Sequence, residues 1–231
     1  MGGSLVEALL VTGLFAGLAY ALGMVSRDGA LGGLVVGTAI YASLGPEGFT
    51  VLALFVVGGS TLTRIGYGRK KESGAAEARG GRRGARNAVA NCSVAVACAL
   101  LAALTGSGAF AAAFIASLGA AFADTSESEV GGLARRTPRL ITTLQKVPPG
   151  TDGAISVPGT LAGGAAAGLT AFLGLALGLV DGPEAALLVA CASFLGTVAD
   201  SLVGALVPRV GNEITNVMCT LVAALLVLAI L

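Results

Sequence analysis

Apolar segments of the length that a helix needs to cross a lipid bilayer follow one another along almost the whole chain. Taking about 20 residues per crossing, the sequence predicts eight helical spans, near residues 5–25, 29–45, 48–66, 87–105, 108–124, 157–180, 184–206 and 213–231. Hydrophobic residues make up 55% of the 231 positions and charged residues 12%, which is typical of polytopic membrane proteins. We therefore expect an all-α transmembrane helical bundle that forms a single integral membrane domain over residues 1–231.

The basic residues predict how this bundle is oriented. All 14 Lys and Arg residues fall in alternate connections, near residue 27 and in 64–86, 125–155 and 207–212. The opposite connections, GPEG, TGSG and DGPE, contain neither residue type. Because basic loops stay in the cytoplasm, we expect a basic cytoplasmic loop over 67–86 and a polar cytoplasmic loop over 125–155. Both termini are then expected on the non-cytoplasmic side of the cell membrane.

Residue types that are absent or isolated exclude several kinds of chemistry. The chain has no histidine, which removes the usual general base and the commonest metal ligand. The four cysteines lie apart in apolar segments without a CxxC pair, so we interpret them as packing residues. Glycines one turn apart, such as Gly37 after Gly33 and Gly178 after Gly174, favour tight packing within the chain, with a homodimer as the second use. No nucleic-acid partner is expected.

The first polar cluster is the basic segment RIGYGRKKESGAAEARGGRRGARNAVANC. Most of its cations serve equally well as an orientation signal or as a patch for anionic lipid headgroups. Asn87 and Asn91 lie one helical turn apart at the start of a span, where an amide needs hydrogen-bond partners. Neighbouring helices or a bound ligand would supply them.

The second cluster, AAFADTSESEVG, closes an apolar span with Asp124, Glu127 and Glu129. Ionised groups near membrane depth are costly, so they indicate function unless they form a simple charge cluster at the membrane edge. In a continuous helix Asp124 shares a face with Ser128 but not with Glu129. Either the helix unwinds after about Asp124 so that both carboxylates bind one ion, or the two serve different partners. Carboxylates facing a cavity suit Mg²⁺, which keeps several waters and bridges phosphates.

The third feature is the polar loop that contains Lys146, Pro148, Pro149, Gly150, Thr151, Asp152 and Gly153. Paired prolines exclude helix there, and glycines permit turns whose amide groups point at one anion. A cation, exposed amides and the N-terminus of the following helix together would make a phosphate cradle. The alternative is a simple turn between helices.

The last cluster, GTVADSLVGALVPRVGNEITNVMCT, places Asp200 about two turns inside the seventh span. Asp200 shares a helix face with Gly196 and Gly204, which leaves room for another backbone or for a ligand. Asn212 and Asn216, again one turn apart, open the last span. These groups form either a ligand site or a hydrogen-bond network between helices.

Several of these segments resemble the motifs of a known family. DTSESEVG, PRLITTLQKVPPGTDGAISVPGTLAG, and GTVADSLVGA followed by NEITNV are similar to the integral membrane family that contains plant phytyl-phosphate kinase and related animal and archaeal proteins. The basic segment GRKKESGAAEARGGRRGARNAVAN resembles the same family, so the likeness covers nearly the whole chain. Two positions depart from its pattern: Ser126 stands where tryptophan is common, and Asp152 where asparagine is expected. The family is similar in turn to the phytol and dolichol kinases, which use CTP.

The resemblance implies a kinase that uses Mg²⁺ and CTP, or ATP, to convert an isoprenoid monophosphate such as phytyl or geranylgeranyl phosphate into the diphosphate. By position it implies Asp124 and Glu129 as metal ligands, Asp200 as a second metal ligand or orienting group, and Lys146 on the transferring phosphate. The residues expected around nucleotide and acceptor are Arg69, Lys70, Arg86, Asn87, Asn91, Ser128, Pro149, Gly150, Thr151, Asp152, Gly153, Ser201, Asn212 and Asn216. The prenyl tail is expected between spans, in contact with membrane lipid.

Other functions use similar residues. A transporter or flippase of a phosphorylated lipid also needs cations and buried carboxylates, but it should leave polar residues along a path to the far side, and the outer halves of these spans are almost wholly apolar. A cytidylyltransferase that acts on a lipid phosphate is the nearest enzymatic alternative. Release of pyrophosphate would distinguish it from a kinase.

Overall fold

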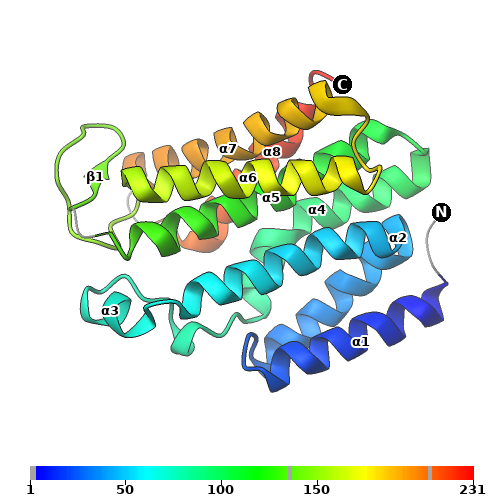
Figure 1. Ribbon diagram of the computed structural model, residues 1–231, viewed down its shortest axis with the longest axis horizontal. Coiled ribbons are helices and arrows are strands. Elements are labelled where there is room, and N and C mark those ends of the chain that lie inside the picture. The colour runs from blue at the N-terminus through cyan, green and yellow to red at the C-terminus, as the bar shows by residue number, and fades with distance from the viewer. Residues whose placement is uncertain (1–3, 135–136, 208–209) are drawn as a thin grey trace.

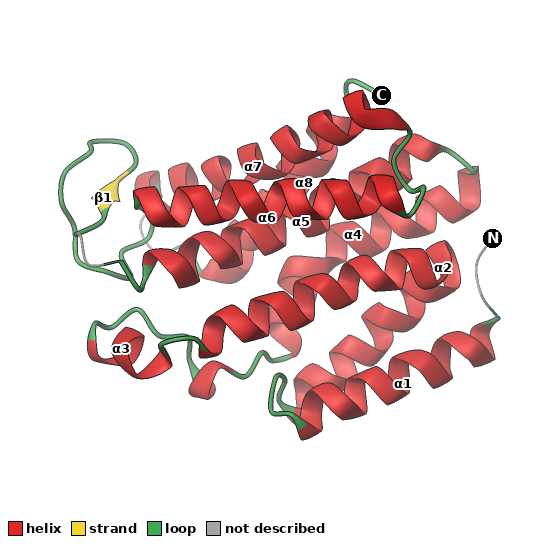
Figure 2. Cartoon of the chain, in the orientation of Figure 1, coloured by secondary structure: helices red, strands yellow, loops and turns green. Residues whose placement is uncertain are grey.

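The computed structural model describes residues 4–134, 137–207 and 210–231, and it is an all-α bundle (Figures 1 and 2). The helices are α1 (Leu5–Ala21), α2 (Arg27–Arg64), α3 (Tyr67–Glu72), α4 (Ala85–Thr105), α5 (Gly108–Gly131), α6 (Val157–Ala176), α7 (Gly182–Leu206) and α8 (Asn212–Leu228), with a short 3₁₀ turn at Arg79–Gly81. Five of them, α2, α4, α5, α6 and α7, are long and apolar enough to cross a membrane, and α1 and α8 are apolar but shorter. The fold class is confirmed, while the number of crossings and the side of the termini stay predictions.

The long helix α2 consists of two antiparallel halves. Gly45, followed by Pro46, has φ 68° and ψ −164°, a backbone conformation that only glycine adopts readily. Before this turn, Tyr41 donates a hydrogen bond to Glu7 of α1 at 2.7 Å. After it, the chain returns along α1, and Arg64 donates to the carbonyl oxygen of Leu22 at 2.5 Å. The predicted spans 29–45 and 48–66 are these two halves.

Helix α5 lies at the centre of the bundle and packs against α2, α4, α6, α7 and α8. Every side chain from Ala111 to Ala123 is buried. Small residues allow this packing: a Cβ atom at Gly196 of α7 would lie 2.6 Å from the carbonyl oxygen of Cys219 in α8 and 3.0 Å from Ala120. Because α5 is central, polar side chains near its C-terminal end face protein rather than lipid.

The glycine pairs predicted to pack tightly do so only in part. A Cβ at Gly37 would lie 3.1 Å from Thr12, and one at Gly174 would lie 2.9 Å from Ile115. At the other members of these pairs, Gly33 and Gly178, a Cβ would have no atom within 4 Å. The same is true of Gly17, Gly164 and Gly168.

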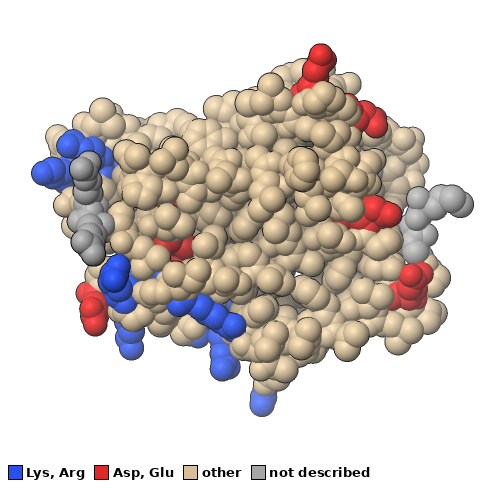
Figure 3. Space-filling view, viewed as in Figure 1, with Lys and Arg blue, Asp and Glu red and all other residues tan. Residues whose placement is uncertain are grey.

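The polar connections gather at one end of the bundle. In Figure 3 the visible Lys and Arg side chains lie toward the end that carries α3, β1 and the α1–α2 turn, and the charged side chains visible at the opposite end are all acidic. Between α5 and α6, strand β1 (Arg139–Leu140) pairs with β2 (Ala154–Ile155) in antiparallel register and closes a small ribbon. Helix α5 continues to Gly131, so the expected loop 125–155 is helical over its first turns. The hydroxyl of Ser126, for example, donates to the Phe122 carbonyl within that helix.

Candidate active site at the polar end of the bundle

A cavity of about 480 Å³ opens at the polar end, between α4, α5, α7, α8, the α3–α4 connection and the α5–α6 connection. It is strongly acidic. Its carboxylates come from Glu77, Asp124, Glu127, Glu129, Asp152 and Asp200. Its amides come from Asn87, Asn91, Asn212 and Asn216, and it has one lining cation among the described residues, Arg83.

Most of the side chains singled out in the sequence meet in this cavity, although they come from five separate segments. Besides the carboxylates and amides, the lining includes Ser128 and the loop residues Pro149, Gly150, Thr151, Asp152 and Gly153. Five expected residues do not line it: Arg69, Lys70, Arg86, Lys146 and Ser201. Arg69, Arg86 and Lys146 are exposed to solvent, and Lys146 lies opposite Arg139 within the ribbon. The carbonyl of Ser201 packs against the loop instead.

Asp124 and Asp200 carry the strongest indication of a bound cation. Asp124 is on α5 and Asp200 on α7, each about two turns before its helix ends. The Oδ1 atom of Asp200 is buried and has no hydrogen-bond partner within the described part of the chain. Among the described residues, none donates a hydrogen bond to Asp124 either. A buried carboxylate oxygen left unpaired costs about 1–3 kcal/mol or more, so a ligand is a better account of Asp200 than a hydrogen-bond network between helices.

The two neighbouring carboxylates on α5 have protein partners. Glu127 lies one turn after Asp124, and its Oε1 accepts a hydrogen bond from the Thr160 hydroxyl of α6 at 2.9 Å.

No group of three or more His, Cys, Asp or Glu side chains within the described ranges is arranged to enclose a metal ion. A cation in this cavity would therefore take part of its coordination from water or from a ligand.

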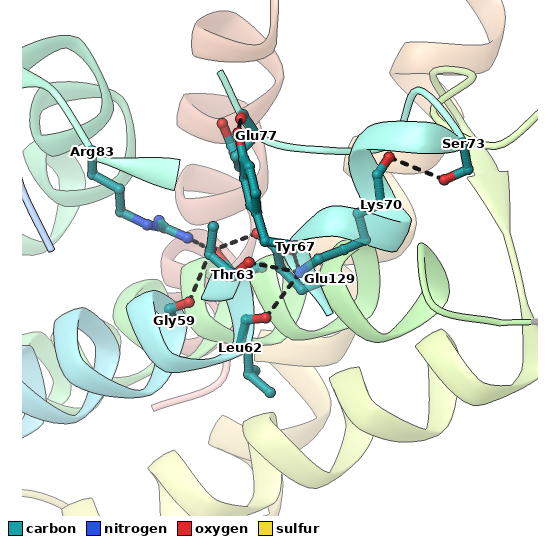
Figure 4. Close-up of polar contacts among 10 residues, drawn as sticks. Gly59, Leu62, Thr63, Tyr67, Lys70, Ser73, Glu77, Arg83 and Glu129 are labelled. Carbon is teal, nitrogen blue, oxygen red and sulfur yellow. Dashed lines mark hydrogen bonds and ion pairs between the residues drawn. The ribbon is translucent and has the colours of Figure 1, made fainter. Parts of the chain in front are cut away.

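Glu129 is placed differently from the expected metal ligand. Helix α5 does not unwind after Asp124, and Glu129 points toward the end of α2, where it forms an ion pair with Lys70 at 2.5 Å (Figure 4). Its other oxygen accepts a hydrogen bond from the Thr63 hydroxyl at 2.5 Å. Lys70, expected among the ligand-binding cations, is 0% exposed and also donates to the Leu62 and Thr63 carbonyls at 2.9 and 2.8 Å. These are carbonyls of the last turn of α2, so Lys70 caps that helix.

Helix termini of both kinds meet at the cavity. The first turns of α4 and α8 contribute Asn87, Asn212 and Thr215 to the lining, and Ser156, the N-cap of α6, contributes a third N-terminus. The positive ends of these three helices favour an anion. The carboxylates belong instead to the C-terminal parts of α5 and α7, whose dipoles favour a cation.

The asparagine amides are partly committed to α4 itself. The Asn87 Oδ1 accepts a hydrogen bond from the Gly84 amide at 3.3 Å, and the Asn91 side chain donates to the Asn87 carbonyl at 3.0 Å. Both side chains nevertheless line the cavity. Asn87 and Asn91 can therefore hydrogen-bond within α4 and also contact a ligand in the cavity.

The proline-glycine loop forms one wall. Gly150 has φ +80° and packs on Gly74, while Gly153 has φ +73° and packs on Ser201 and Ala205 of α7. Within the described chain, the amide groups of Gly150, Asp152 and Gly153 donate no hydrogen bond to another residue. Free amides in a turn of this kind are suited to an anion.

We expect Gly153→Ala to detach this loop from α7. A Cβ there would lie 2.5 Å from the Ser201 carbonyl oxygen and would add the cost of a positive φ. Gly178→Ala is the matched control, because Gly178 has φ +72° but no atom within 4 Å of the added Cβ. Limited proteolysis should therefore cleave residues 139–155 several-fold faster in the first variant than in the second. Equal cleavage rates would contradict the tight contact.

Arg83 and Glu127 line the cavity but were not among the expected site residues. The Arg83 guanidinium donates to the Thr125 hydroxyl at 3.2 Å and lies 5.4 Å from the centre of the Phe55 ring. Its Nε atom is buried and has no hydrogen-bond partner among the residues that the structure describes. A signal for it exists in the sequence, since Arg83, Asn87 and Asn91 are spaced four residues apart. Glu127 is likewise one turn after Asp124.

Comparison with known proteins agrees with this architecture. The model of the family described as integral membrane protein DUF92 matches residues 10–224. The chain belongs to this family. The DUF92 match includes every residue that lines the acidic cavity.

Three relatives are similar to this chain over most of its length. The uncharacterized membrane protein sll0875 of Synechocystis is 37% identical over 203 residues, which are 85% of this chain and 78% of that protein. Protein VTE6, chloroplastic, of Arabidopsis thaliana is 35% identical over 85% of this chain and 57% of its own length. The uncharacterized membrane protein MJ0933 of Methanocaldococcus jannaschii is 35% identical over 87% and 83%. No solved structure matches this DUF92 chain.

Proposed function

We propose that this protein is a prenyl-phosphate kinase, which transfers the terminal phosphoryl group of CTP or ATP to an isoprenoid monophosphate such as phytyl or geranylgeranyl phosphate. The observation that carries the proposal is a single cavity at the polar end of a membrane bundle that combines unpaired carboxylates with three helix N-termini and free loop amides. The family resemblance of the motifs that line it supports the same reaction.

The charge of the cavity supports a requirement for Mg²⁺. Six carboxylates and one arginine line it, so a free polyphosphate would be repelled. Mg²⁺ is usually bound by one or two carboxylates together with waters and substrate phosphates, and the partnerless Oδ1 of Asp200 together with Asp124 fits this donor set. When bound, the ion would neutralise charge on the nucleotide phosphates.

The residues of the chain would mainly position the reactants, as phosphoryl transfer requires. Free amides at Gly150 and Gly153 and the α6 N-terminus would hold the transferring phosphate, and Arg83 with the α4 N-terminus would hold the acceptor phosphate. An acceptor phosphate oxygen then bonds to the terminal phosphorus as the bond from that phosphorus to the bridging oxygen breaks. The products are the prenyl diphosphate and a nucleoside diphosphate. No strong general base is needed, which agrees with a chain that has no histidine.

Two alternatives make different use of the same cavity. A flippase needs a polar route across the bundle, yet the cavity lining stays at one end. The α5 segment that precedes Asp124, from Ala111 to Ala123, is wholly buried and mostly apolar. A lipid-phosphate cytidylyltransferase would use the same carboxylates but release pyrophosphate. Because all the basic connections share the cavity end, we propose that it faces the cytoplasm.

A labelled-nucleotide assay tests the kinase proposal. Purified protein is given Mg²⁺, geranylgeranyl monophosphate, and CTP or ATP labelled at the terminal phosphate. We expect label in geranylgeranyl diphosphate, lost when Mg²⁺ is chelated. In sealed inside-out vesicles, added nucleotide should support the reaction without permeabilisation. Release of labelled pyrophosphate, or no labelled lipid with either nucleotide, would reject the kinase.

A further inference from the structure

A second cavity lies beside the acidic one, and it is almost wholly apolar. It occupies about 70 Å³ between α1, both halves of α2, and α4. Its walls combine aromatic and aliphatic side chains, such as Phe15, Phe49 and Leu52, with small residues, such as Ala19, Gly33 and Ala88. The small residues leave space between helices that pack closely elsewhere.

The apolar cavity and the acidic cavity share two lining residues, Arg83 and Asn87. Arg83 lies between α2 and α5, with its guanidinium over the Phe55 ring on one side and bonded to Thr125 on the other. Its buried Nε atom has no hydrogen-bond partner in residues 4–134, 137–207 and 210–231. A cation at the junction of an apolar and a polar cavity is suited to a molecule that has a phosphate at one end and a hydrocarbon chain at the other.

We propose that the apolar cavity binds the phosphate-proximal part of the acceptor's hydrocarbon chain, and that Arg83 and Asn87 hold its phosphate at the junction. This inference rests on the proposed function for the identity of the acceptor. It assigns the acceptor to the α1–α2–α4 side and leaves the proline-glycine loop side for the nucleotide.

The size of the apolar cavity defines what it selects. A space of about 70 Å³ encloses only the first carbons of a chain, compared with about 150 Å³ for a cavity that holds benzene. The remainder of the chain lies in the bilayer. The site therefore recognises the branched start of a prenyl chain and discriminates little among longer chains.

Gly33 provides a direct test, because it lines the apolar cavity and a Cβ there has no atom within 4 Å. Gly29 of α2 lies at the junction of the two cavities, in contact with Arg83: a Cβ atom at Gly29 would lie 2.1 Å from the Arg83 carbonyl oxygen. Gly33 is one turn, about 6 Å, further along α2. The leucine side chain in Gly33→Leu should therefore fill the apolar cavity without reaching the junction with the acidic cavity. Gly17→Leu is the matched control, because Gly17 also has no neighbour within 4 Å but does not line the cavity.

The kinase assay is run on these variants with two acceptors. We expect Gly33→Leu to lower kcat/KM at least tenfold for geranylgeranyl phosphate and by a similar factor for the five-carbon dimethylallyl phosphate, because both acceptors place the same first carbons in the apolar cavity. Gly17→Leu should leave both values within twofold of the unaltered protein. The proposal is overturned if Gly33→Leu matches Gly17→Leu with both acceptors, or if it lowers the value for geranylgeranyl phosphate alone.

A binding measurement separates this proposal from the kinase proposal. A geranylgeranyl phosphate analogue with a diazirine on its first isoprene unit should label peptides of α1, α2 and α4 by mass spectrometry. Excess geranylgeranyl phosphate should prevent the labelling, and Gly33→Leu should reduce it several-fold. Labelling confined to other helices would reject the assignment even in an active kinase. Labelling of these helices in a protein without kinase activity would reject only the proposed reaction.

Discussion

Asp124→Asn and Asp200→Asn are each expected to lower kcat for phosphoryl transfer by about 10²–10³-fold, the range seen when one preorganised group that stabilises transition-state charge is removed. Asparagine keeps the size of the side chain and removes its negative charge. At Asp200 this deletes the charge on the one buried carboxylate oxygen that lacks a partner among the described residues. The cavity itself should persist, because asparagine keeps the shape of both side chains and at position 200 can still hydrogen-bond to Thr215 of α8.

The measurement is kcat at saturating nucleotide and acceptor over a range of Mg²⁺ concentrations. If the two carboxylates bind the ion, each variant should show a higher half-saturating Mg²⁺ concentration in addition to its lower kcat. Asp181→Asn is the matched control, since Asp181 lies at the opposite end of α7 and does not line the cavity. Unchanged kcat and unchanged Mg²⁺ dependence in both cavity variants would remove the metal role from these residues.

The fold class could be predicted because a membrane helix carries its own signal. A run of apolar residues must form all its backbone hydrogen bonds within the segment, so each span is recognisable without knowing its neighbours. The ends were harder to predict. Helix α5 continues to Gly131 through Glu127 and Glu129, because protein partners on α6 and α3 satisfy those carboxylates.

The location of the site could also be predicted in outline. Carboxylates and amides near one end of several spans must face either lipid or one another, and convergence on one cavity follows from that cost. Which cation belongs to the cavity could not be predicted. Residues 69–86 offer seven Lys and Arg residues. Only the three-dimensional path buries Lys70, exposes Arg69, and directs Arg83 to the junction of two cavities.

The position of Lys146 illustrates the same limit. Its neighbours Pro149 to Gly153 line the cavity, but the ribbon formed by β1 and β2 carries Lys146 outward beside Arg139. Two residues a few positions apart in a loop can face opposite directions. A loop has no regular periodicity from which the direction of each side chain could be predicted. The free amides of the loop, rather than its lysine, are therefore the groups available to an anion.

The ion pair between Lys70 and Glu129 gives the second large effect that we expect. Glu129→Leu should destabilise the protein by about 3–5 kcal/mol, because it leaves the Lys70 charge buried without a counter-ion. Lys70 is 0% exposed and Glu129 5% exposed, so water cannot replace the missing partner. The pair joins α3 and the end of α2 to α5 beside the cavity (Figure 4). Thermal unfolding in detergent should show the loss.

A double variant decides whether Glu129 stabilises the fold or binds metal. In Lys70→Met with Glu129→Leu, both charges are absent, so the destabilisation should be about 1–3 kcal/mol smaller than the sum of the two single variants. Some loss remains because Lys70 also caps the carbonyls of Leu62 and Thr63. If Glu129 acts only through this pair, the folded double variant keeps kcat and its Mg²⁺ dependence within a few-fold of the unaltered protein. A double variant that is folded but as inactive as Asp200→Asn would return Glu129 to the metal site.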